Sequence, residues 1–396
     1  MKKAWRVARL GDVCRFEKEQ DVHIGLPYVG LENIESGTGR FLGATNAVAV
    51  KSATFRFSTE HVLYGRLRPY LNKVLLPDFE GHCSTEIFPI MVAREVSREY
   101  LFHWLSKDAT VKAISATSTG ARMPRANMNA VLDFELPVPP VPEQRRIVAI
   151  LDEAFEGIAT AKANAEKNLQ NACGLIGTGY QSIVESFDQS RWRKAPVADL
   201  AAASKGSIRT GPFGSQLLHS EFVGDGIAVL GIDNAVANEF RWDKRRYITE
   251  EKYRDLVRYR VHPGDVLITI MGTCGRCAVV PDDIPLAINT KHLCCITLDR
   301  KKCMPNYLHI YFLHDPLARA YLTAQVKGSI MAGLNMGIIS VLPVRLPPLD
   351  QQSSIVERFE SLQAESGRLL AVESSKLAAL DELKKSLLHE AFSGAL

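Results

Sequence analysis

The sequence predicts an α+β protein in which two mixed α/β globular segments form a tandem pseudo-repeat, separated by two long helices that pair as an antiparallel coiled coil. The chain has 396 residues, a length that suits two or three domains. Its 46% hydrophobic and 23% charged residues are typical of a folded globular protein and exclude global disorder. Two observations predict the architecture itself: an internal repeat, and two long stretches with helical apolar spacing.

The two halves of the chain resemble each other. The segment LPYVGLENI (26–34) recurs as IAVLGIDNA (227–235), and EYLFHWL (99–105) recurs as NYLHIYF (306–312). From Gly120 onward the separation between matching residues stays constant, without a gap, through the proline-rich stretch and beyond it. Landmarks that keep their order while their separation only grows indicate an old duplication with insertions in loops.

The globular segments are expected at residues 1–142 and 188–349. They contain short β-rich runs such as AVLGI (228–232) and DVLITI (265–270), which Gly, Pro and Asn punctuate as they do between strands and turns. Each segment closes with a proline-rich stop followed by acidic and amide residues. That order suits the beginning of a helix.

The long helices are expected at residues 143–187 and 350–396. Apolar or small residues follow one another at gaps of three or four from Ile147 onward, the pattern of a coiled-coil seam. The second stretch repeats this pattern, but Ser366 and Glu373 weaken the middle of its apolar stripe. Neither helix would be stable alone in water, so we expect the two to pack against each other.

Three glycines stand within six residues of the first predicted helix: Gly174, Gly177 and Gly179. Each costs a helix about 1 kcal/mol relative to alanine. They predict either a kink or close approach of the two helices, or a break in the first helix.

Positive charge is concentrated in the globular segments. The first carries 18 basic against 15 acidic residues and the second 21 against 15, whereas the two helical stretches carry 4 against 6 and 5 against 8. Two basic domains joined by acidic helices suit a protein that grips a polyanion at two places. Two ordinary solvated surfaces would give the same counts.

No apolar run approaches the roughly 18–20 residues that span a bilayer, and the beginning of the chain lacks the apolar stretch of a signal peptide. We therefore expect no membrane association and a cytoplasmic location, with the eight cysteines reduced.

No catalytic motif is apparent in the sequence. It contains no phosphate-binding loop, no Asp/Asn-Pro-Pro-Tyr/Phe tetrapeptide, no nucleophile elbow and no H-E-x-x-H. Cys274 and Cys277 precede the adjacent Cys294 and Cys295. Neighbouring residues of a strand point to opposite faces, so we expect buried thiols and no metal site, although Cys303 could supply a further ligand.

A family resemblance becomes evident at this point. The chain resembles, over essentially its whole length, the specificity (HsdS) subunit of Type I restriction–modification systems. The resemblance lies in LPVPPVPEQRRIVAILDEAF (136–155), its echo LPPLDQQSSIVERF (346–359), the ending LKKSLLHEAFSG (383–394), and the loops YGRLRPYLNKVLL (64–76) and GPFGSQL (211–217).

The resemblance implies a non-catalytic subunit with two target-recognition domains, each reading one half of a split, asymmetric site on double-stranded DNA. The helix pair would hold the domains at a fixed spacing. The implied partners are two methyltransferase subunits, which use S-adenosylmethionine, and restriction subunits, which use ATP and Mg²⁺; no cofactor is expected in this chain. Two readers on the same side of B-DNA lie about one helical turn apart, so a spacer changed by one base pair should abolish recognition.

Candidate DNA contacts are polar and basic residues on loop-like stretches. Arg, Gln and Asn can read base edges with two hydrogen bonds, whereas Lys mostly meets phosphate. In the first segment the candidates are Arg66, Arg68, Lys73, Arg122, Arg125 and Asn127. In the second they are Arg209, Ser215, Gln216, Arg276, Lys291, Lys327 and Asn335.

Other interpretations stay open from the sequence. The chain could be a two-headed DNA-binding scaffold without sequence preference, outside restriction–modification. It could be an enzyme with an unrecognised hydrolytic site built from residues such as Glu32, Asp233 and His292. A relative that still assembles but reads no DNA is a third interpretation.

Overall fold

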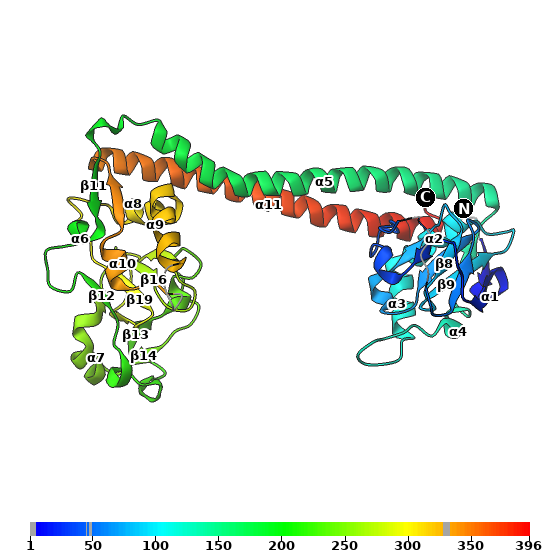
Figure 1. Ribbon diagram of the computed structural model, residues 1–396, viewed down its shortest axis with the longest axis horizontal. Helices are drawn as coiled ribbons and strands as arrows, with labels where there is room; N and C mark the ends of the chain where they lie inside the picture. Colours follow the sequence, from blue (N-terminus) through cyan, green and yellow to red (C-terminus); the bar gives the residue numbers. More distant parts are fainter. Residues whose placement is uncertain (1–4, 45, 47–49, 328–332) are drawn as a thin grey trace. The chain divides into compact units, whose positions relative to one another are not determined.

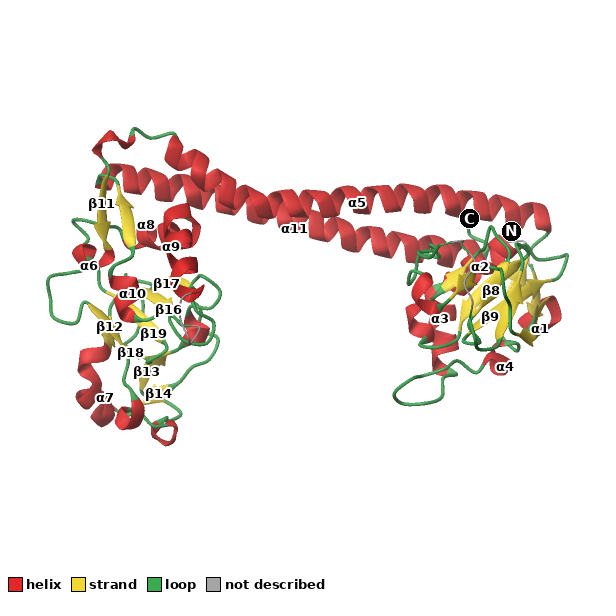
Figure 2. Cartoon of the chain, in the orientation of Figure 1, coloured by secondary structure: helices red, strands yellow, loops and turns green. Residues whose placement is uncertain are grey.

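The computed structural model describes residues 5–44, 46, 50–327 and 333–396. The chain divides into two compact units, the first formed by residues 1–168 with 372–396 and the second by residues 169–371. Each unit contains one globular domain and part of both long helices (Figure 1). The units are mixed α/β, with strands confined to the globular domains (Figure 2).

The described residues of the first domain form three sheets. Its strands are β1 (Arg6–Arg9), β2 (Cys14–Phe16), β3 (Gln20–Asp21), β4 (Tyr28–Val29), β5 (Thr54–Phe57), β6 (His61–Gly65), β7 (Val74–Leu75), β8 (Gly81–Cys83), β9 (Ile87–Val92) and β10 (Glu135–Val138). Its helices are α1 (Leu10–Val13), α2 (Arg98–Ser106), α3 (Asp108–Ala116) and α4 (Met128–Val131). The sheet orders are β1-β10, β2-β9-β6-β7 and β3-β5-β8-β4.

The second domain repeats this plan. Its strands are β11 (Arg193–Pro196), β12 (Ile208–Thr210), β13 (Ile227–Leu230), β14 (Tyr247–Ile248), β15 (Arg260–Val261), β16 (Val266–Thr269), β17 (Cys277–Val279), β18 (Ala287–Asn289), β19 (Leu293–Ile296) and β20 (Pro343–Leu346). Its helices are α6 (Val197–Leu200), α7 (Glu250–Leu256), α8 (Pro305–His314), α9 (Pro316–Lys327) and α10 (Met336–Ser340). The sheet orders are β11-β20, β12-β19-β16-β17 and β14-β13-β18-β15.

The tandem repeat is confirmed at the level of strand pairing. In the first domain β8 lies between β4, which is parallel to it, and β5, which is antiparallel. In the second domain β18 lies between the parallel β13 and the antiparallel β15. The copies differ at the sheet edge, because β3 pairs with β5 whereas β14 pairs with β13. The duplication has therefore conserved the central strands and varied the edge.

A buried glutamine anchors each long helix to its domain. Gln144 Oε1 accepts a hydrogen bond from Ser97 N (2.8 Å), and its Nε2 donates to Glu95 O (2.7 Å) and Pro139 O (2.8 Å). Gln352 makes the same three bonds in the second domain, to Met304 N (2.9 Å), Lys302 O (3.0 Å) and Pro347 O (2.9 Å). Both amides are fully buried, so the repeated proline–glutamine segment is a structural joint.

The long helices are α5 (Val141–Glu185) and α11 (Leu349–Ser393). In the first unit they run antiparallel, with Lys162 paired to Asp381 and Asn168 Nδ2 donating to Glu373 Oε1 (3.0 Å). In the second unit they are antiparallel too, because Ser366 Oγ donates to Ala172 O (2.9 Å) and Arg358 Nη1, earlier in the chain, donates to Ser186 Oγ (2.8 Å) just after the end of α5. Ser366 and Glu373, which interrupt the apolar stripe, thus provide hydrogen bonds between the helices.

Helix α5 continues without a break through its three glycines, so the alternative of a broken helix is wrong. Nothing lies within 4 Å of where a Cβ would stand on Gly174 or Gly177. At Gly179 a Cβ would overlap the side chain of Leu362 on α11. The close approach predicted from the sequence therefore occurs at Gly179.

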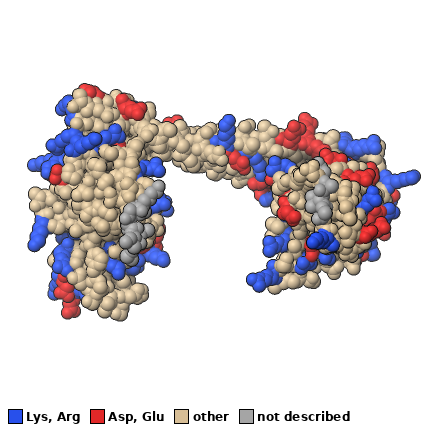
Figure 3. Space-filling model, in the orientation of Figure 1, with Lys and Arg blue, Asp and Glu red and all other residues tan. Residues whose placement is uncertain are grey.

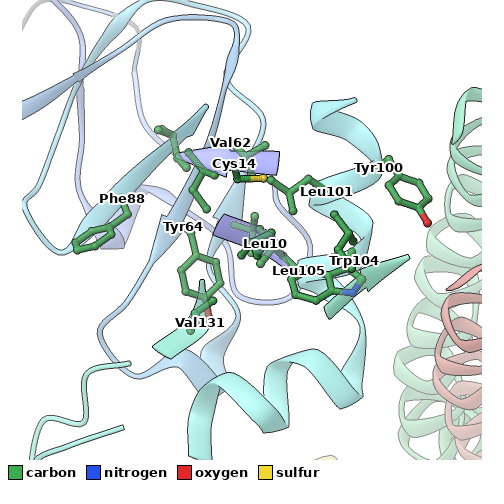
Figure 4. Close-up of a cluster of buried hydrophobic side chains, with 14 of the residues drawn as sticks. Leu10, Cys14, Val62, Tyr64, Phe88, Tyr100, Leu101, Trp104, Leu105 and Val131 are labelled. Carbon is green, nitrogen blue, oxygen red and sulfur yellow. The ribbon is translucent and has the colours of Figure 1, made fainter. Parts of the chain in front are cut away.

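Each domain core includes the far end of a long helix. In the first domain, α1, β6 and α2 bury Leu10, Tyr64 and Leu101 together (Figure 4), and Phe392 near the end of α11 joins the same core. Its ring lies 4.9 Å from that of Tyr100. In the second domain the end of α5 supplies Tyr180, Ile183 and Val184. Each core is thus closed by a helix that follows the other domain in sequence.

Candidate nucleic-acid interface

The first domain brings together the two stretches that carry its predicted arginine contacts. Residues 65–73 form one loop and residues 119–127 another, and their backbones pair directly. Arg68 N donates to Pro124 O (2.7 Å), and Ala126 N donates to Arg66 O (2.9 Å). Four predicted contacts therefore share one surface, called the arginine surface below: Arg66, Arg68, Arg122 and Arg125.

A carboxylate organises the arginine surface. Glu86, in the turn just before β9, accepts from Arg66 Nε (3.0 Å) through one oxygen and from Arg125 Nε (2.9 Å) through the other. The guanidinium of Arg66 also lies over the Phe88 ring, 5.3 Å from its centroid. Arg68 adopts a left-handed backbone conformation, with φ of 51°. Such a backbone in a residue other than glycine is costly and marks a loop held by its surroundings.

Two other predicted contacts of the first domain have structural partners. Lys73 Nζ donates to Leu31 O (2.6 Å) and Ile34 O (2.9 Å), which ties its loop to the domain. Asn127 caps α4, and its side chain accepts from Ala130 N (3.3 Å). These bonds give both side chains a structural role in the first domain.

Arg209 belongs to the interior of the second domain. Its side chain is only 10% exposed and forms an ion pair with the buried Asp265 (2.6 Å). It also donates to Thr297 Oγ1 (2.9 Å) and to the carbonyl of Arg260. These bonds occupy the hydrogen-bond donors of the guanidinium, so we do not place Arg209 among the DNA contacts.

The loop of residues 211–217 in the second domain, called the Gly-rich loop below, is exposed at residues 213–216. Ser215 and Gln216 lie in a 3₁₀ turn at Gly214–Gln216, and Gln216 Oε1 accepts from Phe213 N (3.2 Å) and Tyr259 Oη (2.9 Å). The Phe213 residue is 48% exposed. This loop presents an amide, a hydroxyl and an aromatic ring to solvent, a set that can contact bases and sugars.

The segments that carry three of the remaining predicted contacts of the second domain lie together. Ile270 N donates to His292 O (2.9 Å), beside Lys291, and Arg276 lines a pocket together with Leu334, the residue before Asn335. Arg276 is exposed just before β17, and Lys291 is half-buried just before β19. Asn335 caps α10 by accepting from Ile338 N (2.9 Å), as Asn127 does for α4. Lys327 ends α9, but its side chain lies outside the described residues. On the face shown in Figure 3, Lys and Arg lie on both domains, interspersed with Asp and Glu.

The residues of the alternative hydrolytic set are divided between the two units. Glu32 belongs to the first unit, whereas Asp233 and His292 belong to the second. The carboxylate of Asp233 is paired with Arg246. Burial, together with the nearby positive charge of Lys291, lowers the pKa of His292.

The cysteines of the second domain are core residues. Cys277 and Cys294 belong to one hydrophobic cluster and Cys295 to another, so adjacent residues of β19 face opposite sides of the sheet as predicted. Burial raises the pKa of Cys294 to about 12. Cys303 is buried in the same cluster as Cys294. Within the described part of the chain, no group of three or more His, Cys, Asp or Glu side chains is placed to hold a metal ion.

The helices of the described residues include none that is both long and apolar enough to cross a membrane. This holds for α5 and α11 despite their length, because charged residues occur along both.

The sequence of this chain matches the model of the Type I restriction modification DNA specificity domain over residues 2–170 and 238–374, and the protein belongs to this family. The two matched stretches cover most of both domains and part of both long helices.

Several specificity subunits of Type I restriction enzymes are similar to it. The EcoDI subunit of Escherichia coli is 30% identical over 154 residues, covering 38% of this chain but 33% of its own length. The EcoBI subunit of E. coli is 24% identical over 76% of this chain and 66% of its own. The MjaVIII subunit of Methanocaldococcus jannaschii is 20% identical over 99% of this chain and 93% of its own.

Two solved structures share the fold along the whole chain. One comes from a study of complex assembly and conformational transition of the type I R-M system, with a TM-score of 0.77, 22% identity and coverage of 100% of this chain and 99% of that one. The other is the HsdS subunit from Thermoanaerobacter tengcongensis, with a TM-score of 0.65, 21% identity and coverage of 100% and 98%.

Proposed function

We propose that this protein is the DNA-specificity subunit of a Type I restriction–modification enzyme and that it has no catalytic activity of its own. Each domain reads one half of a bipartite, asymmetric site on double-stranded DNA. The observation that supports the proposal is a duplicated domain. Both copies are attached to their long helices by the same buried glutamine and the same three hydrogen bonds, whereas the exposed loops of the two copies differ.

The contrast between framework and loops supports two distinct half-sites. The buried amides of Gln144 and Gln352 make the same bonds in both copies. The first domain exposes the arginine surface, whereas the second exposes the Gly-rich loop with Phe213 and Gln216. Because bases are read by side chains at the surface, two copies with different loops recognise different sequences.

The long helices serve as the spacer of this design. An uninterrupted α5 and a paired α11 suit a connection that fixes the distance between the two half-sites. The chain recruits two methyltransferase subunits and the restriction subunits in the cytoplasm. S-adenosylmethionine, ATP and Mg²⁺ are bound by those partners and not by this chain.

The test is a map of methylated adenines in the source strain with and without the gene. The proposal expects one split, asymmetric motif to disappear on deletion. In vitro, the chain assembled with a methyltransferase subunit of its source strain should bind that motif and fail to bind versions with one base pair inserted into or deleted from the spacer. Binding without sequence preference would support a general DNA scaffold instead, and equal binding of the spacer variants would refute a fixed spacing.

The arginine surface gives a second, local test. Replacing both Arg66 and Arg68 by alanine should weaken DNA binding while assembly with the methyltransferase is retained. Unchanged DNA affinity would remove that loop from the interface.

A further inference from the structure

We propose that Arg66 reads a guanine in the half-site of the first domain, that Glu86 and Arg125 position its guanidinium, and that the second domain cannot read its half-site in this way. The inference rests on the function proposed above and extends it to one base and one side chain.

The hydrogen bonds of Arg66 leave the base-reading edge of its guanidinium free. Its Nε donates to Glu86, and within the described residues neither of its Nη groups has a hydrogen-bond partner. Two Nη donors on a rigid planar fork match the O6 and N7 acceptors of guanine in the major groove. The side chain is 32% exposed, so this edge is accessible while the rest of the side chain is held.

Three contacts hold the fork in place. Glu86, only 20% exposed, bonds to Arg66 through one carboxylate oxygen and to Arg125 through the other. The Phe88 ring lies beneath the Arg66 guanidinium. The backbones on either side are paired as well, since Ala126 N donates to Arg66 O. A guanidinium fixed in this way loses little freedom when it meets a base.

The carboxylate also favours a base over a phosphate as the ligand of Arg66. Glu86 places negative charge between Arg66 and Arg125, which reduces the attraction of this group for a phosphate. A base edge carries no net charge, so the carboxylate does not repel it but orients the fork. Arg68 and Arg122, which lie on the same loops and have no carboxylate partner among the described residues, suit phosphate contacts.

The exposed apolar side chains of the same two loops fit a base-reading surface. Tyr70 is 58% exposed two residues after Arg68, and Met123 is 46% exposed beside Arg122. Large apolar groups exposed next to arginines can contact thymine methyl groups and sugars, whereas they add nothing to a site for phosphate alone.

One backbone hydrogen bond of this site recurs in the second domain, where the side chains differ. Arg66 N donates to Glu86 O, and Ile270 N donates to His292 O, both at 2.9 Å. These bonds make Ile270 the counterpart of Arg66, and His292 the counterpart of Glu86. The counterpart of Arg125 is Gly333, 208 positions later in the constant register of the repeat. At these three positions the second domain therefore has no arginine–carboxylate–arginine group.

The experiment uses the full chain assembled with its methyltransferase and the motif found by methylation mapping. Each guanine of the two half-sites is replaced in turn by 7-deazaguanine, which lacks the N7 acceptor, and binding is measured with the native protein and with Arg66→Lys. We expect that replacement of one particular guanine weakens binding by the native protein roughly 5-fold or more. The same replacement should not weaken binding by the Arg66→Lys variant any further, because the contact is already lost. Lysine keeps the positive charge of arginine but lacks its two planar Nη donors. If Arg66 contacted a phosphate and not a base, the Arg66→Lys variant would therefore bind DNA with near-native affinity, and the proposal would be wrong.

Two further variants separate positioning from stability. Glu86→Gln should reduce discrimination at the same guanine without changing the melting temperature of the complex enough to account for it. Arg15→Lys is the matched control: this arginine of the same domain also pairs with a glutamate, Glu17 (2.7 Å), but lies outside the proposed interface, and it should leave discrimination unchanged.

The outcomes distinguish this inference from the proposed function. A methylation map that does not change on gene deletion overturns the function. If the motif is lost on deletion, two results overturn only the role of Arg66. One is that the losses of binding caused by Arg66→Lys and by base replacement add up at every guanine, and the other is that neither half-site contains a guanine.

Discussion

The buried glutamine that joins each domain to its long helix offers the most decisive test of the structural reasoning. In Gln144→Leu, a side chain of similar size keeps the packing but loses all hydrogen bonds of the amide. The substitution leaves Ser97 N without its acceptor, and Glu95 O and Pro139 O without their donor. Because Gln144 is fully buried, water reaches these groups only if the joint opens.

The magnitude follows from those three groups. A buried backbone group left without its partner costs about 1–3 kcal/mol, so the loss of three partners predicts about 3 kcal/mol or more in the stability of the first unit. Gln352→Leu should cost the second unit a similar amount, because its amide makes the same three bonds.

Gln144→Glu adds a test of the donor role. A carboxylate can still accept from Ser97 N but cannot donate to the two carbonyl oxygens. Burial next to carbonyls would raise the pKa of this carboxyl in the folded protein, so protonation favours folding. The destabilisation should therefore be greatest above the raised pKa and should diminish as the pH falls through it.

The measurement is hydrogen exchange followed by mass spectrometry in mild denaturant, which reports the opening of each unit separately, because a two-unit chain has no single unfolding free energy. Gln144→Leu should increase exchange in the first domain and Gln352→Leu in the second. If the stability of the substituted unit falls by less than about 0.5 kcal/mol, the estimate is refuted, because this is less than the net contribution of one hydrogen bond.

Three further predictions concern the second unit and the helices. Arg345→Met leaves the Asp315 carboxylate, 1% exposed, without its cationic partner, and hydrogen exchange in mild denaturant should show a loss of about 3 kcal/mol in that unit. Gly177→Ala should stabilise α5 by about 1 kcal/mol, whereas Gly179→Ala should gain less because the added methyl group displaces a leucine of α11; thermal melts of the two variants compare them directly. Burial, with nearby positive charge, lowers the pKa of His314 from 6.5 to about 4, so its contribution to stability should be lost as the pH falls through this range. A His314→Gln variant should show a flatter pH dependence of unfolding there, and an unchanged slope would contradict the assignment.

Local features of the sequence were sufficient to predict the repeat and the helices. Apolar residues spaced three or four apart specify a helix face wherever they occur, and α5 and α11 begin and end within three residues of the positions predicted. The constant register after Gly120 likewise predicted two copies of one domain, because a duplicated chain retains its order of strands and joints. These features depend on neighbours along the chain or on comparison of the chain with itself.

The roles of individual polar residues were decided only by the tertiary structure. Arg209 looks like a DNA contact in its Gly-rich surroundings, but Asp265, 56 residues away, takes its guanidinium into the core. Ser366 weakens a helix stripe in the sequence, yet it bonds to a carbonyl of the other helix. Arg66 and Arg125 lie 59 residues apart in the sequence and meet at Glu86 because their loops pair. Strand register and loop closure determine which distant residues become partners, and the local spacing of residues in the sequence does not specify them.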